Sequence, residues 1–388
     1  MAKIKTTGLD LRKDVPIAWK TLRRMNPCLS AIVQGDCWIY TVADEQELES
    51  WLKETPHFHN TPSTSREVFP IRKFTGRAAL HVLLQTQEPG LLAPHTHLDG
   101  IGVYTVLNNL LQALADASVN HSPKLGDEAQ HLVPPLNVLA DIPAVTDSNR
   151  STFQSMLGSW VAGFAGVNIQ LNVPGRPCRE PRILYTPSGV SETKRIVAKC
   201  KELGLTVTAA VKAAVSVALH KQVKSTATMQ SAVTIRNVRK WIDKTTHPAT
   251  DLVGPLSVPV PAVFTLADDF VETAHLAKQT YREPEQTDLL RILPRFCGNE
   301  MVAIMTSPPP GRQAPSSLGL SSFGVLDAYV KPSYEGAAGR KVEGDMRLQC
   351  VYNEAYHEKE AVAALLKATG DELLQGLGLG HNQANGTA

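Results

Sequence analysis

The residues best suited to chemistry stand in one short segment, Pro94-His95-Thr96-His97-Leu98-Asp99-Gly100. His95 can accept a proton from a hydroxyl, an amine or a thiol, because histidine is the side chain most often used as a general base. Asp99 follows four residues later and stands next to Gly100. If Asp99 turns into the core it needs a cationic partner, because an unpaired buried carboxylate is costly. The segment therefore predicts a base on a loop that an ion pair holds in place.

The segments on either side of this loop must position it. The apolar run 78–84, bounded by Gly76 and by Pro89-Gly90, has the length of a buried strand. After the loop, apolar residues recur with helical spacing at positions 103, 106, 107, 110, 111 and 114. We expect His95 to lie between a core strand and a core-facing helix, at the edge of a cleft. Taken alone, the H-x-x-x-D-G pattern is equally compatible with a hydrogen-bonded loop histidine.

The remaining patterns describe an alternation of helices and strands. We expect a helix over 10–25, a hairpin from 29–33 and 37–42, a short helix over 45–53 and a loop over 55–67. His57 and His59 in that loop have no third ligand nearby, so we interpret them as solvated and expect no metal site. Later segments predict helices at 191–203, 206–218, 268–281 and 358–377, and a strand at 232–236 that ends in the basic group Arg236, Arg239 and Lys240.

Proline and glycine concentrate between residues 165 and 182, which predicts a boundary between two domains. The domains would span residues 1–170 and 181–379, and residues 380–388 would form a disordered tail. A chain of 388 residues is long enough for this division.

Composition excludes several classes of function. The chain has 39 basic and 37 acidic side chains and a net charge of +2, so neither nucleic acid nor an anionic membrane is an expected partner. Its 6 cysteines are scattered without a C-x-x-C pair, which favours reduced thiols. The first residues have no apolar signal core, and no apolar run reaches membrane-spanning length. We expect a cytoplasmic protein.

The segment around His95 resembles the HxxxDG motif of the superfamily that contains chloramphenicol acetyltransferase, the plant BAHD acyltransferases and the condensation domains of nonribosomal peptide synthetases. Residues 18–27 are similar to the first helix of that superfamily and its basic stretch that ends in proline. Residues 316–327 and 351–359 resemble C-terminal segments of fungal members, particularly trichothecene O-acetyltransferase-like proteins.

This resemblance implies an α/β fold of two chloramphenicol-acetyltransferase-like lobes, each a mixed sheet flanked by helices, with an active-site tunnel between them. It also implies an acyltransferase that moves an acyl group, expected to be acetyl, from acyl-CoA to a hydroxyl of a small secondary metabolite. Acyl-CoA would be a co-substrate, and no bound cofactor is expected. The site residues that the resemblance implies are His95 as base, Asp99 with Gly100, Arg236 as partner of Asp99, and Ser322, Tyr352 and Asn353 as substrate-binding polar groups.

Two departures from the fungal pattern keep other functions open. The chain starts almost at the first helix, and it is short between Ala328 and Arg347. If these differences alter the donor tunnel, His95 could serve as base for a dehydration, cyclisation or rearrangement that does not use CoA. A catalytically inactive binding protein is a third alternative. The sequence favours a monomer without fixing the oligomeric state.

Overall fold

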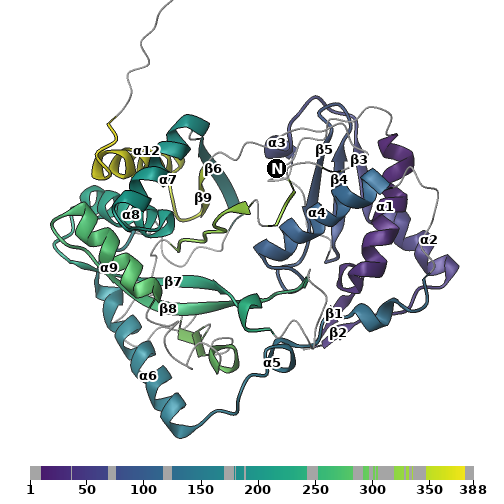
Figure 1. Cartoon of the computed structure of the whole chain (residues 1–388), viewed down its shortest axis with the longest axis horizontal. Helices are drawn as coiled ribbons and strands as arrows, with labels where there is room; N and C mark the ends of the chain where they lie inside the picture. The colour runs from purple at the N-terminus through teal and green to yellow at the C-terminus, as the bar shows by residue number, and fades with distance from the viewer. Residues whose placement is uncertain are drawn as a thin grey trace, which may run out of the picture. The chain divides into compact units, whose positions relative to one another are not determined.

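The computed structural model describes residues 10–35, 37–68, 76–116, 125–169, 179, 181–187, 189–242, 252–282, 292–296, 300–301, 303–304, 319–326, 329–331, 334 and 347–380. The chain forms two compact units (Figure 1). Unit 1 contains residues 1–141, 237–257 and 325–343, and unit 2 contains residues 142–236, 258–324 and 344–388. Both are mixed α/β, as the sequence predicts.

The sheet of unit 1 has the strand order β3-β4-β5 (Pro56–His59, Ala79–Leu83, Glu88–Leu92). β3 and β4 are parallel, whereas β4 and β5 are antiparallel. Helices α1 (Leu11–Met25) and α4 (Gly100–Asp116) pack together and contribute to one buried cluster with Leu80 and Val82 of β4. Trp19 and Trp51 are fully buried in this cluster and stack with ring centroids 5.4 Å apart. The predicted buried strand and both flanking helices are confirmed.

Two strands lie where the sequence predicted none. β3 falls within the expected loop 55–67, because its parallel pairing with the buried β4 outweighs the local proline signal. Pro89 and Gly90 lie inside β5 instead of bounding the previous strand. Proline is tolerated there because β5 is an edge strand in this sheet.

The expectation that His57 and His59 are solvated is also wrong. His57 pairs with His81 in the register of the two parallel strands, and their ring centroids are 4.7 Å apart. The Nε2 atom of His59 lies 2.9 Å from Nδ1 of the buried His81. Both imidazoles therefore contact His81 on one face of the sheet, because residues two apart on a strand share a face.

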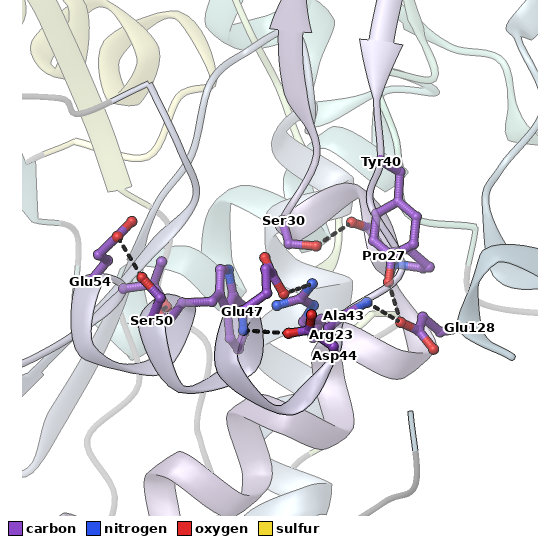
Figure 2. Close-up of polar contacts among 12 residues, drawn as sticks. Arg23, Pro27, Ser30, Tyr40, Ala43, Asp44, Glu47, Ser50, Glu54 and Glu128 are labelled. Atoms are coloured by element: carbon purple, nitrogen blue, oxygen red, sulfur yellow. Dashed lines mark hydrogen bonds and ion pairs between the residues drawn. The ribbon is translucent and has the colours of Figure 1, made fainter. Parts of the chain in front are cut away.

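Unit 1 also contains several short elements. They are η1 (Pro27–Leu29), the hairpin of β1 (Ile32–Gln34) and β2 (Cys37–Ile39), α2 (Glu45–Glu54), α3 (Ser65–Val68), η3 (Glu128–His131) and α5 (Leu136–Leu139). The buried Arg23 of α1 donates to Glu47 of α2 at 2.7 Å, and the hydroxyl of Tyr40 donates to the buried Glu128 at 2.6 Å (Figure 2). These charge-assisted bonds fix the hairpin and α2 on the core.

Unit 2 contains two pairs of strands. β6 (Pro181–Pro187) pairs antiparallel with β9 (Arg347–Asn353), and β7 (Met229–Asn237) is hydrogen-bonded to β8 (Ser257–Thr265). The helices are α6 (Asp147–Ala162), η4 (Gly163–Ala165), α7 (Val190–Glu202), α8 (Val207–Val223), α9 (Phe270–Arg282), η7 (Leu293–Arg295) and α12 (Lys359–Gly376). α8 packs against both α9 and α12 (Figure 1). Thr206 caps α8, since its side chain accepts from the N–H of Ala209.

The units divide the chain differently from the expected boundary between 170 and 181. Residues 142–169 belong to unit 2, because the indole N–H of Trp160 on α6 donates to the carbonyl of Ala232 on β7 at 3.1 Å. Residues 237–257 return to unit 1. The expected tail falls almost entirely outside the described residues.

Among the described residues, no single helix is long and apolar enough to span a membrane; α7 and α8 meet that test only as a pair bent by 100°.

Candidate active site

The motif segment connects the end of β5 to the start of α4. Asp99 is the residue before the helix, and its Oδ1 accepts the N–H of Gly102 at 2.7 Å, which is the geometry of an N-cap. Its carbonyl accepts the N–H of Val103 at 3.0 Å. Gly100 is the first residue of α4. Asp99 therefore caps the N-terminus of α4, the helix that follows the motif.

Asp99 forms a two-pronged ion pair with Arg239, which lies on η5 (Arg239–Trp241) directly after β7. Nη1 donates to Oδ2 at 2.7 Å and Nη2 donates to Oδ1 at 2.9 Å. The side chains are 3% and 14% exposed, so water screens the pair little. Such forked geometry is the strongest form of an arginine–carboxylate contact.

All the N–H donors of Arg239 are used inside the protein. Besides Asp99, the guanidinium donates from Nε to the carbonyl of Leu252 at 3.1 Å, from Nη2 to the carbonyl of Gly254 at 3.2 Å, and from Nη1 to Oδ1 of Asn237 at 3.3 Å. An arginine has five N–H donors, and these contacts account for each of them. Arg239 is therefore a positioning residue with no donor left for a substrate.

The sequence-based assignment of Arg236 as the partner of Asp99 is wrong. Arg236 still belongs to β7, where it donates to the carbonyl of Tyr281 on α9 and lies 5.2 Å from the centroid of that ring. The strand ends at Asn237, and only the following turn brings an arginine to Asp99. The sequence contained the basic group, but the residue at which the strand ends decides which member reaches the motif.

Gly102 allows the backbone of α4 to approach that of Gly254 closely beside the ion pair. The N–H of Asp99 donates to the carbonyl of Gly254 at 3.2 Å. A Cβ on Gly102 would lie 3.2 Å from Oδ1 of Asp99 and 3.3 Å from the carbonyl oxygen of Gly254. Sequence reasoning did not select these glycines. The signal for Gly102 was its place three residues after a capping aspartate.

The second histidine of the motif ties the loop to the β1–β2 hairpin. Nε2 of the fully buried His97 lies 2.9 Å from the carbonyl oxygen of Ala31, which can only accept, so we assign the ring proton to Nε2. Nδ1 then accepts from the hydroxyl of Thr96 at 3.1 Å. Burial lowers the pKa of His97, although the bond to Ala31 acts in the opposite direction. A neutral, stacked His97 beside Trp38 is thus structural.

His95, two residues before His97, lies in a different environment. It is exposed, and it lines an open cavity of about 690 Å³ in unit 1. The cavity is bordered by the hairpin and by the residues at the ends of β4 and β5: Ile32, Val33, Gly76, Arg77, Ala93, Pro94, His95 and Thr96. A rigidly held loop therefore presents one imidazole to a space large enough for a small molecule.

The residues expected to bind substrate from the second lobe all lie in unit 2. Ser322 is exposed, and its hydroxyl is 2.9 Å from that of Thr208. Tyr352 of β9 is buried, with 9% of its surface exposed. Asn353 accepts from the N–H groups of Arg179 and Ala355, each at 3.0 Å, and donates to the carbonyl of Arg179. Its amide thus closes the end of the β6–β9 pair, and the binding roles of all three stay predictions.

Within the described ranges, no group of three or more histidine, cysteine, aspartate or glutamate side chains is arranged to hold a metal ion.

Several solved structures resemble this chain in fold. The trichothecene 15-O-acetyltransferase TRI3 from Fusarium sporotrichioides aligns over 97% of this chain and 88% of its own, with a TM-score of 0.79 and 15% identity. The epimerization domain of tyrocidine synthetase B aligns over 97% and 91%, with a TM-score of 0.60 and 14% identity. The chain therefore shares its fold with these two proteins. The predicted α/β fold of two units is confirmed, and the tunnel expected between them stays a prediction.

The chain has sequence relatives in the fungus Monascus ruber. It is 25% identical to the O-acetyltransferase pigM of Monascus ruber over 90% of this chain and 73% of the relative. It is 24% identical to the acetyltransferase pigO of the same organism over 99% of this chain and 91% of the relative. No family model matches the sequence.

Proposed function

We propose that the chain is an acyltransferase that moves an acetyl group from acetyl-CoA to a hydroxyl of a small secondary metabolite. One observation carries the proposal: an exposed histidine lines a cavity, on a loop fixed by a saturated, buried ion pair. The names of pigM, pigO and TRI3 support acyl transfer as the type of reaction.

The reaction would proceed through His95. The imidazole takes the proton of the acceptor hydroxyl as its oxygen attacks the carbonyl carbon of the thioester. The tetrahedral intermediate collapses with cleavage of the carbon–sulfur bond, and the imidazolium returns its proton to the leaving thiolate. The products are the ester and free CoA, so protons balance without another reactant.

Loss of the imidazole tests this function. We expect His95→Ala to lower acceptor-dependent release of CoA thiol by about 100- to 10,000-fold, as is typical when a general base is removed. His131→Ala is a matched control, because His131 is also exposed and lies on η3 of the same unit. Both variants should keep the wild-type melting temperature. A variant without His95 that retains a tenth of the wild-type rate would show that another group is the base.

The same measurement separates acyl transfer from the CoA-independent alternative. Acyl transfer requires that thiol release depend on the acceptor and that the product gain an acetyl group. A His95-dependent change in a donor-free substrate, with no thiol released from acetyl-CoA, would replace acyl transfer by dehydration, cyclisation or rearrangement.

A further inference from the structure

The cavity at His95 has an uneven chemical lining. Ile32, Val33, Ala93 and Pro94 give it apolar walls. Among the described residues that line it, Arg77 is the one with a permanent full charge. No carboxylate belongs to the part of that lining that the structure describes. A neutral or cationic ligand would leave the guanidinium facing an apolar surface, whereas an anionic group would pair with it. The lining thus favours ligands with an apolar body and an acidic group.

Arg77 has donors to offer such a group. Among the described residues its contact is with Glu54, where Nη1 and Oε2 are 3.4 Å apart. That distance is beyond the usual range of roughly 2.7 to 3.2 Å for a strong N–H to oxygen bond. Arg239 of the same unit donates five times at distances of 3.3 Å or less. The two arginines therefore differ: all donors of Arg239 are used by the fold, whereas Arg77 makes a single long contact within the part of the chain that the structure describes.

Glu54 is a weak competitor for Arg77. It stands at the end of α2, its side chain is 55% exposed, and its other oxygen accepts from the hydroxyl of Ser50 at 3.1 Å (Figure 2). An exposed pair of this kind contributes little, so a ligand anion can replace Glu54 at modest cost. The planar guanidinium then offers a carboxylate or phosphate two parallel donors.

We propose that Arg77 binds an anionic group of the ligand that occupies the His95 cavity, so that this cavity takes acidic small molecules with an apolar body. The inference deepens the proposed function and rests on it, since it treats this cavity as the place where donor or acceptor meets His95. The anion could be a carboxylate of the acceptor or a phosphate of the donor, and both present the same chemistry to the guanidinium.

Matched probes that differ in charge test the proposal by calorimetry. For the acceptor, 4-hydroxyphenylacetate is compared with 4-hydroxyphenylacetamide; for the donor, acetyl-CoA is compared with the neutral thioester N,S-diacetylcysteamine. We expect Arg77→Gln to weaken a charged probe about tenfold or more, the usual scale for a hydrogen bond to a charged group, and to leave its neutral partner unchanged.

Two further variants separate binding from a general effect of charge. Glu54→Gln removes the competing carboxylate and should tighten the same charged probe by several fold. Arg24→Gln removes an arginine of similar exposure, 39%, that is paired with Asp127 away from the cavity lining, and should have no effect. A structural role of the Arg77–Glu54 pair would make Arg77→Gln and Glu54→Gln act in the same direction, whereas ligand binding makes them act in opposite directions.

Each outcome decides the question. An effect confined to the hydroxy acid supports an acidic acceptor, and an effect confined to acetyl-CoA supports contact with a donor phosphate. Equal or absent binding of charged and neutral probes by the wild type, or equal losses in Arg77→Gln and Arg24→Gln, would overturn the proposal. Because binding does not require turnover, failure here leaves acetyl transfer intact, and failure of thiol release in the His95 assay leaves the binding result intact.

Discussion

At the scale of single residues, the motif contains residues that hold the loop and one residue that is accessible to a ligand. Asp99 and His97 are buried and hydrogen-bonded, whereas His95 between β5 and α4 is exposed to a cavity. His95 and Thr96 are exposed, whereas the three residues that follow them are buried. His95 is free to meet a substrate because His97 and Asp99, and not His95 itself, hold the loop.

The ion pair beneath the motif should be strongly coupled. We expect Asp99→Asn and Arg239→Gln each to lower the free energy of unfolding by roughly 3 to 5 kcal/mol, because each leaves one charge buried without its partner. The double variant should cost clearly less than the sum, as measured by denaturant unfolding. Asp99→Asn combined with Arg236→Gln is the control and should be additive to within about 0.5 kcal/mol. Additivity in the first pair would refute the assignment of Arg239.

Lys212 makes a second prediction at this scale. It is 1% exposed on α8, where Nζ donates to Oε1 of Gln230 at 2.7 Å and lies 4.4 Å from the ring centroid of Phe264. Burial lowers the pKa of Lys212 from 10.5 to about 7. The unfolded chain therefore binds more protons than the native one between about pH 7 and pH 10.5, and the native state gains stability as pH rises through that window.

Replacing this lysine removes the cost of burying its charge. We expect Lys212→Met to raise the free energy of unfolding at pH 7. In the wild type this free energy should increase by on the order of 2 kcal/mol from pH 7 to pH 9 because of Lys212, and the variant should lack that increase. Lys221→Met on the same helix is the control, since Lys221 is 60% exposed. Parallel stability curves for wild type and Lys212→Met between those pH values would contradict the inferred protonation.

At the scale of elements, close approach of α4 to the chain around Gly254 depends on Gly102. We expect Gly102→Ala to lower both melting temperature and turnover, because its Cβ would lie 3.2 Å from Oδ1 of Asp99 and would push the cap and ion pair apart. Gly158→Ala on α6 is the opposite case: nothing lies within 4 Å of its Cβ. That variant should gain roughly 0.5 to 1 kcal/mol from reduced chain entropy. Thermal unfolding and thiol release together check both.

Most elements could be predicted from their periodicity, and the failures have physical causes. The apolar spacing around residues 103–114 gave α4, and the caps at Thr206 and Asp99 are local signals. β3 and β5 were missed because pairing with β4, not their own composition, makes them strands. Local patterns do not contain that information.

The candidate site could also be predicted only in part from local sequence patterns. The candidate base and its loop could be found from residue types, but the partner of Asp99 depends on where β7 ends, within a basic group whose members look alike in sequence. Arg77 was not selected at all, since an arginine before a buried strand is an ordinary feature until the hairpin is seen to border the same cavity.

At the scale of the whole molecule, unit 1 is not continuous in sequence. Residues 237–257 return to it after almost a hundred residues of unit 2, and they contribute Arg239, Gly254 and the buried Val253 of the main cluster of unit 1. The N–H of Val238 donates to the carbonyl of Leu256 at 3.1 Å, so this returning segment closes on itself beside the motif. The motif helix and the segment that supports it therefore form one structure from two distant stretches of chain.

This arrangement predicts how fragments behave. A fragment of residues 1–141 would leave Asp99 buried without a cation and would expose the surface that Val253 covers, so we expect it to lack cooperative thermal unfolding by circular dichroism. The same fragment joined to residues 237–257 by a flexible glycine–serine linker should regain a cooperative transition, because the ion pair and the carbonyl of Gly254 are restored. Arg239→Gln in the joined fragment should abolish that gain. Cooperative unfolding of residues 1–141 alone, at the same temperature as the joined fragment, would show that the returning segment does not hold the motif.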